Sequence, residues 1–161
     1  MRAIYLDSNI LIAYYSIDRP ESGKKQLVRD ALAVFAKAEP SEVWLCTSAW
    51  AVTEMVNILI SAKKMDPARV ADIESRLFAE PFGGLKLHGR GVSPDKDYDF
   101  ARFFADVRAG ILKYHSGVGD VIHSVIMKNH GIDYILTFDE HDFKQIPGLT
   151  VFHPRDVIHA V

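Results

Sequence analysis

Two patterns of apolar residues alternate along the chain. Short runs of consecutive apolar residues predict strands that are buried on both faces, because no polar residue alternates with them. Longer segments, in which apolar residues recur every three or four positions, predict amphipathic helices. The predicted strands cover residues 3–6, 43–46, 85–88, 134–136 and 149–152. The predicted helices cover residues 10–15, 21–37, 48–63, 66–80, 95–114, 121–130 and 154–161.

The alternation of strands with helices predicts a three-layer α/β/α domain. Parallel strands joined by right-handed helical crossovers form a mostly parallel sheet with helices on both of its faces. No linker is long enough to divide the chain, and no internal repeat occurs in it. The 161 residues, 48% of them hydrophobic, suffice for one core. We therefore expect residues 1–161 to form a single domain.

Charge and cysteine content narrow the class of protein. A formal net charge of −2 excludes a strongly basic protein that coats nucleic acid by bulk charge, but not a nuclease with an acidic metal pocket. The lone cysteine, Cys46, rules out an intrachain disulfide and fits a reducing, cytoplasmic compartment as a buried, inert thiol. Asp7, Ser8 and Asn9 interrupt the apolar N-terminus, so we expect neither a signal peptide nor a membrane span.

Four acidic residues stand apart from the acids that belong on a solvated surface. Asp7 and Asp139 each follow a predicted buried strand, at the sheet edge where α/β proteins bind ligands. Glu54 lies on a helix among mainly apolar neighbours, and Asp120 opens a helix after the turn at 116–119. Each has a simpler interpretation: a turn or cap for Asp7, a structural ion pair for Glu54, and a helix-dipole contact for Asp120. Together, however, they can converge above the carboxyl edge of one sheet.

Converging carboxylates imply a bound cation. Unpaired acids in one pocket repel one another unless they are protonated or bind metal. Oxygen ligands without cysteine favour Mg²⁺ or Mn²⁺ over zinc, and such a site suits phosphodiester hydrolysis. Ser8, Asn9 and Thr137 flank the acids and are expected to orient them by hydrogen bonds. Helix capping is an alternative role for Ser8 and Asn9.

The histidines do not indicate a zinc site. All seven are scattered, and none forms the paired helical spacing of a zinc protease. His123 follows Asp120 by one helical turn and could line the pocket. The favoured interpretation is a histidine of the core or rim whose hydrogen bonds are satisfied.

Four motifs in this order resemble the PIN-domain family, and within it the small VapC-like toxins. They are residues 5–11, Glu54, residues 120–123 and residues 135–139, within a span from Ile4 to His153. The resemblance implies a Mg²⁺-dependent ribonuclease selective for single strands, often dimeric, that serves as the toxin of a type II toxin–antitoxin pair. The residues that match the acidic positions of the family are Asp7, Glu54, Asp120 and Asp139.

The same resemblance implies a cognate antitoxin that holds the enzyme inactive. We expect a basic side chain of that partner to enter the unpaired acid set. One departure concerns Asp142: the spacing from Asp139 to Phe143 is one or two residues longer than the family often has. Asp142 is therefore left out of the expected site.

Two other functions compete with this interpretation. A phosphatase of the haloacid dehalogenase type would use Asp7 as a nucleophile, but it expects a second aspartate where Asn9 stands and a lysine partner that is not evident. A non-catalytic PIN-like module that binds RNA or protein would be indicated by the loss of one of the four acids. All four are present.

Overall fold

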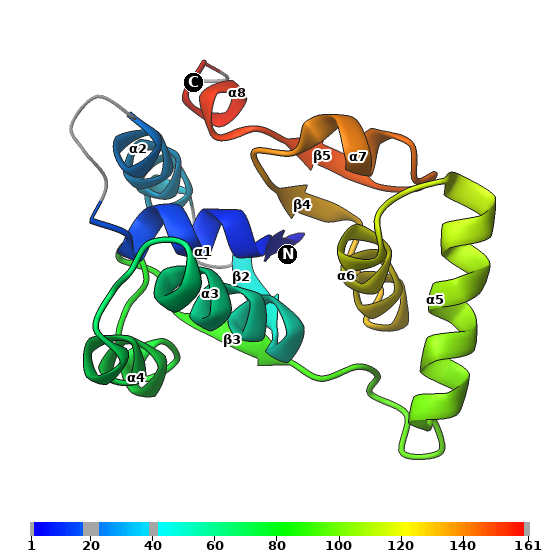
Figure 1. Ribbon diagram of the computed structural model, residues 1–161. Coiled ribbons are helices and arrows are strands. Elements are labelled where there is room, and N and C mark those ends of the chain that lie inside the picture. Colours follow the sequence, from blue (N-terminus) through cyan, green and yellow to red (C-terminus); the bar gives the residue numbers. More distant parts are fainter. Residues whose placement is uncertain (1, 18–22, 39–41, 160–161) are drawn as a thin grey trace.

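A five-stranded sheet forms the centre of the molecule in the computed structural model, which describes residues 2–17, 23–38 and 42–159 (Figure 1). The strands are β1 (Arg2–Leu6), β2 (Val43–Ser48), β3 (Leu87–Arg90), β4 (Tyr134–Leu136) and β5 (Thr150–Phe152). Their order across the sheet is β3-β2-β1-β4-β5, and every neighbouring pair is parallel. The predicted parallel sheet is thus confirmed.

Helices cover both faces of this sheet, which confirms the three-layer α/β/α architecture. The helices of the described residues are α1 (Ser8–Tyr15), α2 (Lys24–Lys37), α3 (Ala49–Ser61), α4 (Pro67–Arg76), α5 (Phe100–Tyr114), α6 (Val118–Asn129), α7 (Glu140–Lys144) and α8 (Pro154–His159). One apolar cluster joins Ile4 and Leu6 to α1, α2, α3, α4 and α8. Another joins Tyr5 to α6 and α7, and a third packs α5 against α6.

The sheet residues reach both layers because successive side chains of a strand point to opposite faces. Ile4 and Leu6 therefore enter one core cluster, whereas Tyr5 between them enters the other, beside Cys46. Cys46 is buried, as predicted, and burial raises the pKa of its thiol to about 12. A thiol with so high a pKa stays protonated at neutral pH and is a poor nucleophile.

The strand order places a topological switch point between β1 and β4. The chain continues from β1 toward β2 and β3 on one side, and β4 and β5 occupy the other side. Crossovers that leave in opposite directions open a crevice at the carboxyl ends of the two central strands, where α/β proteins bind ligands. Asp7 follows β1 and Thr137 follows β4, so both lie at this crevice.

Several element boundaries differ from those predicted. α7 was not predicted, because one turn of helix is too short to show an apolar period. α5 begins at Phe100 rather than at residue 95, since Asp99 caps it through Arg102 N at 2.7 Å. β3 is displaced toward its C-terminus by pairing with β2, and α6 begins at Val118, which puts Asp120 inside its first turn. The predicted start of the helix at 21–37 and the predicted end of the helix at 154–161 lie outside the described residues.

None of the helices in the described ranges is long and apolar enough to cross a membrane.

Candidate active site at the carboxyl edge of the sheet

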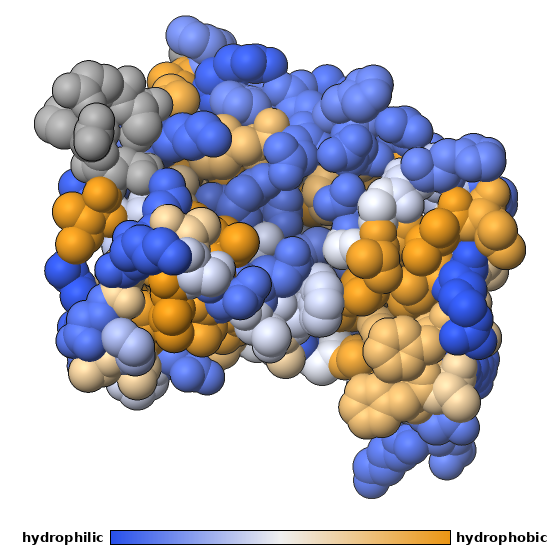
Figure 2. Space-filling model, in the orientation of Figure 1, coloured by the Kyte–Doolittle hydropathy of each residue, from blue (hydrophilic) through white to orange (hydrophobic). Residues whose placement is uncertain are grey.

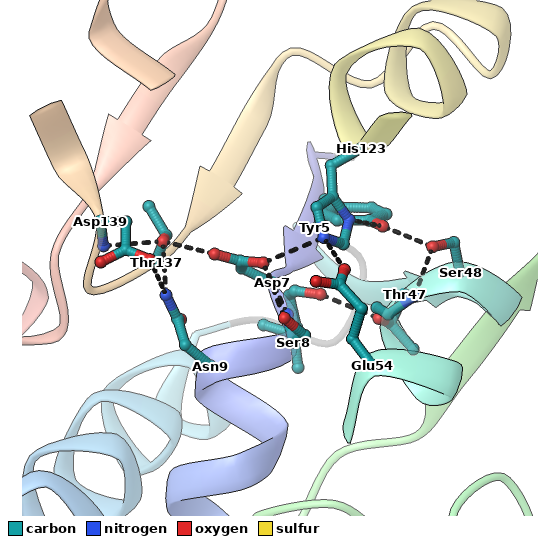
Figure 3. A network of polar contacts seen from close by, with 12 residues as sticks. Tyr5, Asp7, Ser8, Asn9, Thr47, Ser48, Glu54, His123, Thr137 and Asp139 are labelled. Carbon is teal, nitrogen blue, oxygen red and sulfur yellow. Dashed lines mark hydrogen bonds and ion pairs between the residues drawn. The ribbon is translucent and has the colours of Figure 1, made fainter. Parts of the chain in front are cut away.

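Asp7 is a buried carboxylate held from two sides. It directly follows β1, it is only 3% exposed, and it forms the N-cap of α1. Asp7 Oδ1 accepts the backbone N–H of Ser8 at 2.7 Å, and Oδ2 accepts the hydroxyl hydrogen of Thr137 at 2.7 Å (Figure 3). The sequence allows either Asp7 or one of Ser8 and Asn9 to cap this helix; Asp7 is the cap, because its extended backbone brings Oδ1 to the first free N–H group. Ser8 Oγ lies 3.4 Å from the same oxygen.

Thr137 connects Asp7 to Asp139. Its buried Oγ1 donates to Asp7 and accepts hydrogen bonds from the Asp139 backbone N–H at 2.9 Å and from Asn9 Nδ2 at 3.1 Å. Asn9 Nδ2 also donates to Asp139 Oδ2 at 3.1 Å, and Asn9 Oδ1 accepts from the Phe138 N–H at 3.3 Å. These bonds hold the end of β4 against the start of α1 and fix the two carboxylates relative to each other.

His123 bridges Asp7 and Glu54. The imidazole lies on α6 and is almost fully buried, and its Nε2 is 2.6 Å from Glu54 Oε1 and 3.3 Å from Asp7 Oδ1 (Figure 3). The Glu54 side chain, on α3, is 30% exposed. Its Oε1 is nevertheless buried, and no well-aligned hydrogen bond reaches it from the described residues, although the His123 nitrogen is so close. Glu54 is thus placed at the site by a short but misaligned polar contact.

Asp120 reaches the same crevice from the first turn of α6. This turn lies beside Glu54, because a Cβ added at Gly119 would make an ordinary van der Waals contact with Glu54 Oε2 at 3.5 Å. Partial burial raises the pKa of Asp120 from 3.8 to about 6. The charges of Asp7, Asp142 and Asp139 add to this rise, and His123 opposes it. The acids therefore act on one another through a shared environment.

Two other pKa values record the same crowding. Burial raises the pKa of the Asp7 carboxyl, while His123 and the Thr137 hydrogen bond work against that rise. For His123, burial disfavours the charged ring, but the contact with Glu54 and the charges of Asp7 and Asp120 outweigh burial and raise its pKa. Perturbed pKa values of this kind cluster at functional sites.

The four predicted acids do not all occupy the site in the same way. Asp7 and Glu54 meet at His123, Asp120 lies close enough to Asp7 for their charges to interact, and the exposed Asp139 is joined to Asp7 through Asn9 and Thr137. His123 is buried with its ring between Asp7 and Glu54; its position one turn after Asp120 indicates that it can line the pocket, but the sequence does not show that this face of the helix turns toward Glu54. The acid set was expected to lack any partner within this chain; the structure instead places His123 Nε2 between Asp7 and Glu54, although without a well-aligned hydrogen bond to Glu54 Oε1.

The donor set suits a hard divalent cation in its chemistry. Carboxylate oxygens dominate it, and the buried Glu54 Oε1 lacks a well-aligned hydrogen-bond donor, as a ligand atom would before a cation binds. Among the described residues, however, no three His, Cys, Asp or Glu side chains are already spaced to hold a metal ion. A cation would therefore need small side-chain movements, for which the partly exposed Glu54 and Asp139 have room.

A separate groove of about 540 Å³ lies between α5, α6 and the loop before β5. Its lining carries both acids and bases, among them Asp106, Lys113, Lys128 and Asp133, and contains none of the four predicted acids. Mixed charges without a convergent set of donors indicate no particular chemistry. The acid cluster is therefore the candidate active site.

Known proteins resemble this chain in structure and not detectably in sequence: no family model and no curated protein matches it. The structure of Mycobacterium tuberculosis VapC20, described as a sarcin–ricin loop cleaving toxin, is 16% identical with a TM-score of 0.60, covering 89% of this chain and 95% of that one. DNA-bound VapBC from Salmonella typhimurium is 16% identical with a TM-score of 0.60, covering 96% and 99%. VapBC2 from Rickettsia felis, bound to promoter DNA, is 15% identical with a TM-score of 0.61, covering 94% and 98%.

Identities this low establish the fold alone. The matched length nevertheless includes nearly all of both chains, and the parallel sheet with flanking helices is shared. The chain therefore has the PIN-domain fold of the VapC toxins, which the order of its four acidic motifs had implied.

Proposed function

We propose that this protein is a metal-dependent endoribonuclease that hydrolyses RNA phosphodiester bonds as the toxin of a type II toxin–antitoxin pair. The observation that carries the proposal is the convergence of Asp7, Glu54 and Asp120 at the switch point of a VapC-like fold. Asp139 lies at the rim of the same crevice, bonded to Asn9. Enzymes that cleave phosphodiesters with metal ions use such carboxylate clusters.

Asp7, Glu54, Asp120 and Asp139 are the residues that would hold Mg²⁺ or Mn²⁺. When bound, the cation would supply activation of water and neutralisation of charge on the phosphate. The chain itself supplies orientation: Thr137 and the Ser8 N–H fix both oxygens of Asp7. Asn9 and Thr137 hold Asp139 at the same edge. Asp120 lies in the first turn of α6, where the positive end of the helix dipole would favour a bound phosphate.

We propose a protein antitoxin as the natural inhibitor. Support comes from the VapBC complexes among the structures of the same fold. A guanidinium from the partner would meet Asp120 and Asp139, which are half-buried and exposed, more readily than Asp7. We expect the pair to act in the cytoplasm, where the buried thiol of Cys46 stays reduced.

We also propose that the enzyme is a homodimer, as the resemblance implies. The large apolar side chains exposed on α5 and at the start of α6 offer a surface for a second copy: Phe100 is 70% exposed, Leu112 77% and Val118 57%. Figure 2 shows apolar residues gathered over this part of the molecule, while the region between α1, α3 and α6 is mainly hydrophilic. Equilibrium sedimentation of wild type and of Phe100→Ser tests the proposal; a monomeric wild type would contradict it.

The decisive experiment is a cleavage assay with purified protein on unstructured and duplex RNA. We expect cleavage of the unstructured RNA with Mg²⁺ or Mn²⁺, none with EDTA, and none in Asp7→Asn. RNA binding without cleavage in any metal would instead favour the non-catalytic module. A covalent phosphate on Asp7 after incubation with a phosphate monoester would favour the phosphatase.

A further inference from the structure

Hydrogen-bonding contacts connect the N-terminus of α3 to the acid cluster through the side chains of Ser48, Tyr5 and His123. Ser48, the N-cap of α3, accepts the Ala51 N–H at 3.1 Å. Ser48 Oγ lies 2.5 Å from the Tyr5 hydroxyl, and the Tyr5 hydroxyl lies 2.7 Å from His123 Nδ1 (Figure 3). The other ring nitrogen of His123 faces Glu54 and Asp7. Ser48, Tyr5 and His123 are all buried, so water does not replace these contacts.

The short distances limit where the protons of this chain can lie. An unprotonated ring nitrogen and a carboxylate oxygen would repel each other at 2.6 Å, so a hydrogen must lie between them, and we place it on Nε2 of His123. Ser48 already accepts the Ala51 N–H and can donate its own hydrogen to Tyr5, which in turn donates to Nδ1. Each hydroxyl of the chain then has both a donor and an acceptor.

Packing holds the ring in this orientation. The Tyr5 ring meets the His123 imidazole edge-on, with ring centroids 5.6 Å apart. The centroid of the Phe143 ring lies 6.3 Å from that of the imidazole. Tyr5 stands two residues before Asp7 on β1, and His123 stands three residues after Asp120 on α6. The strand that ends before Asp7 therefore carries the tyrosine that contacts the imidazole, and the helix that carries Asp120 also carries the imidazole itself.

We propose that His123 is a positioning residue, which holds Glu54 beside Asp7 by directing its Nε2 proton between their carboxylates, in an orientation set by Tyr5 and Ser48. The proposal rests on the proposed metal-dependent function and deepens it. Glu54 has no other close anchor at the site among the described residues. Without the imidazole, the partly exposed side chain of Glu54 is free to turn toward solvent, and a cation that binds must then order this side chain. Groups that orient metal ligands in this way typically account for about 10–100-fold in metal affinity.

Matched substitutions separate a donated proton from simple filling of space. Gln and Leu are both close to His in size, but only Gln presents an N–H near the position of Nε2. Isothermal titration with Mn²⁺ should show binding weakened about 10–100-fold in His123→Leu and distinctly less in His123→Gln. Equal affinity in wild type, His123→Leu and His123→Gln would overturn the proposal. Equal weakening in both variants would also overturn it, since the donated proton would then be irrelevant.

Two further measurements leave His123 itself unchanged, so they do not depend on whether the fold accepts another side chain at that position. Tyr5→Phe keeps the ring and removes the hydroxyl behind Nδ1, so we expect weaker Mn²⁺ binding, with Tyr134→Phe, outside this network, unchanged. In the metal-free wild type, two-dimensional ¹H–¹⁵N spectra of labelled histidine should show Nε2 of His123 bearing a proton at neutral pH. An unprotonated Nε2 would overturn the proposal. If wild type binds no Mn²⁺ at all, the metal-dependent function fails, and the spectra still decide the role of His123.

Discussion

Thr137 donates its hydroxyl hydrogen to Asp7 Oδ2 over 2.7 Å, although the two residues stand 130 positions apart. The contact exists because β4 pairs with β1, with Leu6 opposite Leu136, so that the residues that follow these two strands meet at one edge. It is the central bond of the candidate site, since Thr137 Oγ1 also receives hydrogen bonds from Asn9 and Asp139.

Replacing Thr137 by valine should destabilise the protein. The change keeps the branched shape but leaves one oxygen of a buried carboxylate and the Asp139 N–H without this partner. A loss of this kind costs about 1–3 kcal/mol, which lowers the melting temperature of a domain this size by roughly 2–12 °C. Thr150→Val, at an exposed site on β5, is the matched control and should leave the melting temperature nearly unchanged. Equal melting of Thr137→Val and wild type would mean that the bond contributes nothing to stability.

Asp120→Asn should stabilise the metal-free protein above pH 6. Because the folded pKa of about 6 exceeds the ordinary 3.8, the folded state binds this proton more tightly than the unfolded chain does. Ionised Asp120 therefore penalises folding above pH 6, the penalty is relieved as pH falls through about 6, and it is absent below about 3.8. The gain in melting temperature should be full at pH 7.5 and should shrink toward pH 4.

The control for this pH profile is Asp133→Asn, which removes the same charge from an exposed position outside the cluster. We expect it to alter the melting temperature little at either pH. A profile for Asp120→Asn that is flat, or that runs in the opposite direction, would contradict the shared environment of the acids.

Divalent metal should stabilise wild type and stabilise Asp120→Asn less. Binding to the folded state alone adds roughly 1–3 kcal/mol at ten to a hundred times the dissociation constant. The variant lacks one ligand charge, so its affinity and hence its stabilisation fall. Thermal melts with a series of Mn²⁺ concentrations measure both proteins, with Asp133→Asn again expected to follow wild type. Absence of any metal-induced shift in wild type would count against the metal site.

Asp7→Asn and Asp120→Asn should each lower RNA cleavage on the order of a thousandfold or more, if each carboxylate supports a cation. Asparagine keeps the size of aspartate, and at position 7 its amide oxygen could still accept the Ser8 N–H, so the fold should persist. Single-turnover rates on a labelled RNA, with far-ultraviolet circular dichroism as the check on folding, measure the effect. Undiminished rates in either variant, once contaminating ribonuclease has been excluded, would refute the assignment.

The antitoxin should inhibit through a basic side chain placed near Asp120 and Asp139. These acids remain accessible, whereas His123 already lies against Asp7 and Glu54. Neutralising the arginines and lysines of the cognate partner that lie nearest the site should weaken inhibition of cleavage more than it weakens complex formation. Full inhibition by the neutralised partner would show that it acts by covering the crevice and not through charge.

The sequence by itself determined the α/β architecture and singled out four acids as candidates for the site. Consecutive apolar residues before Asp7 and Asp139 mark strands buried on both faces, and a strand buried on both faces needs helices on each side. The period of apolar residues placed Glu54 and Asp120 on helices. These signals are local, because they depend on the spacing of apolar residues within one element, and one sequence without homologues is enough to detect them.

Only the tertiary structure decided which groups meet. Strand order, not sequence spacing, brings Thr137 to Asp7 and leaves Asp139 at the rim. The rotation of α6 about its axis turns His123 toward Glu54 and Tyr5, and a period of apolar residues cannot specify that rotation for a polar residue on the buried face. The pairing of Asp7 and Glu54 with an internal imidazole was therefore hidden from the sequence, because it depends on three elements packing together at one edge of the sheet.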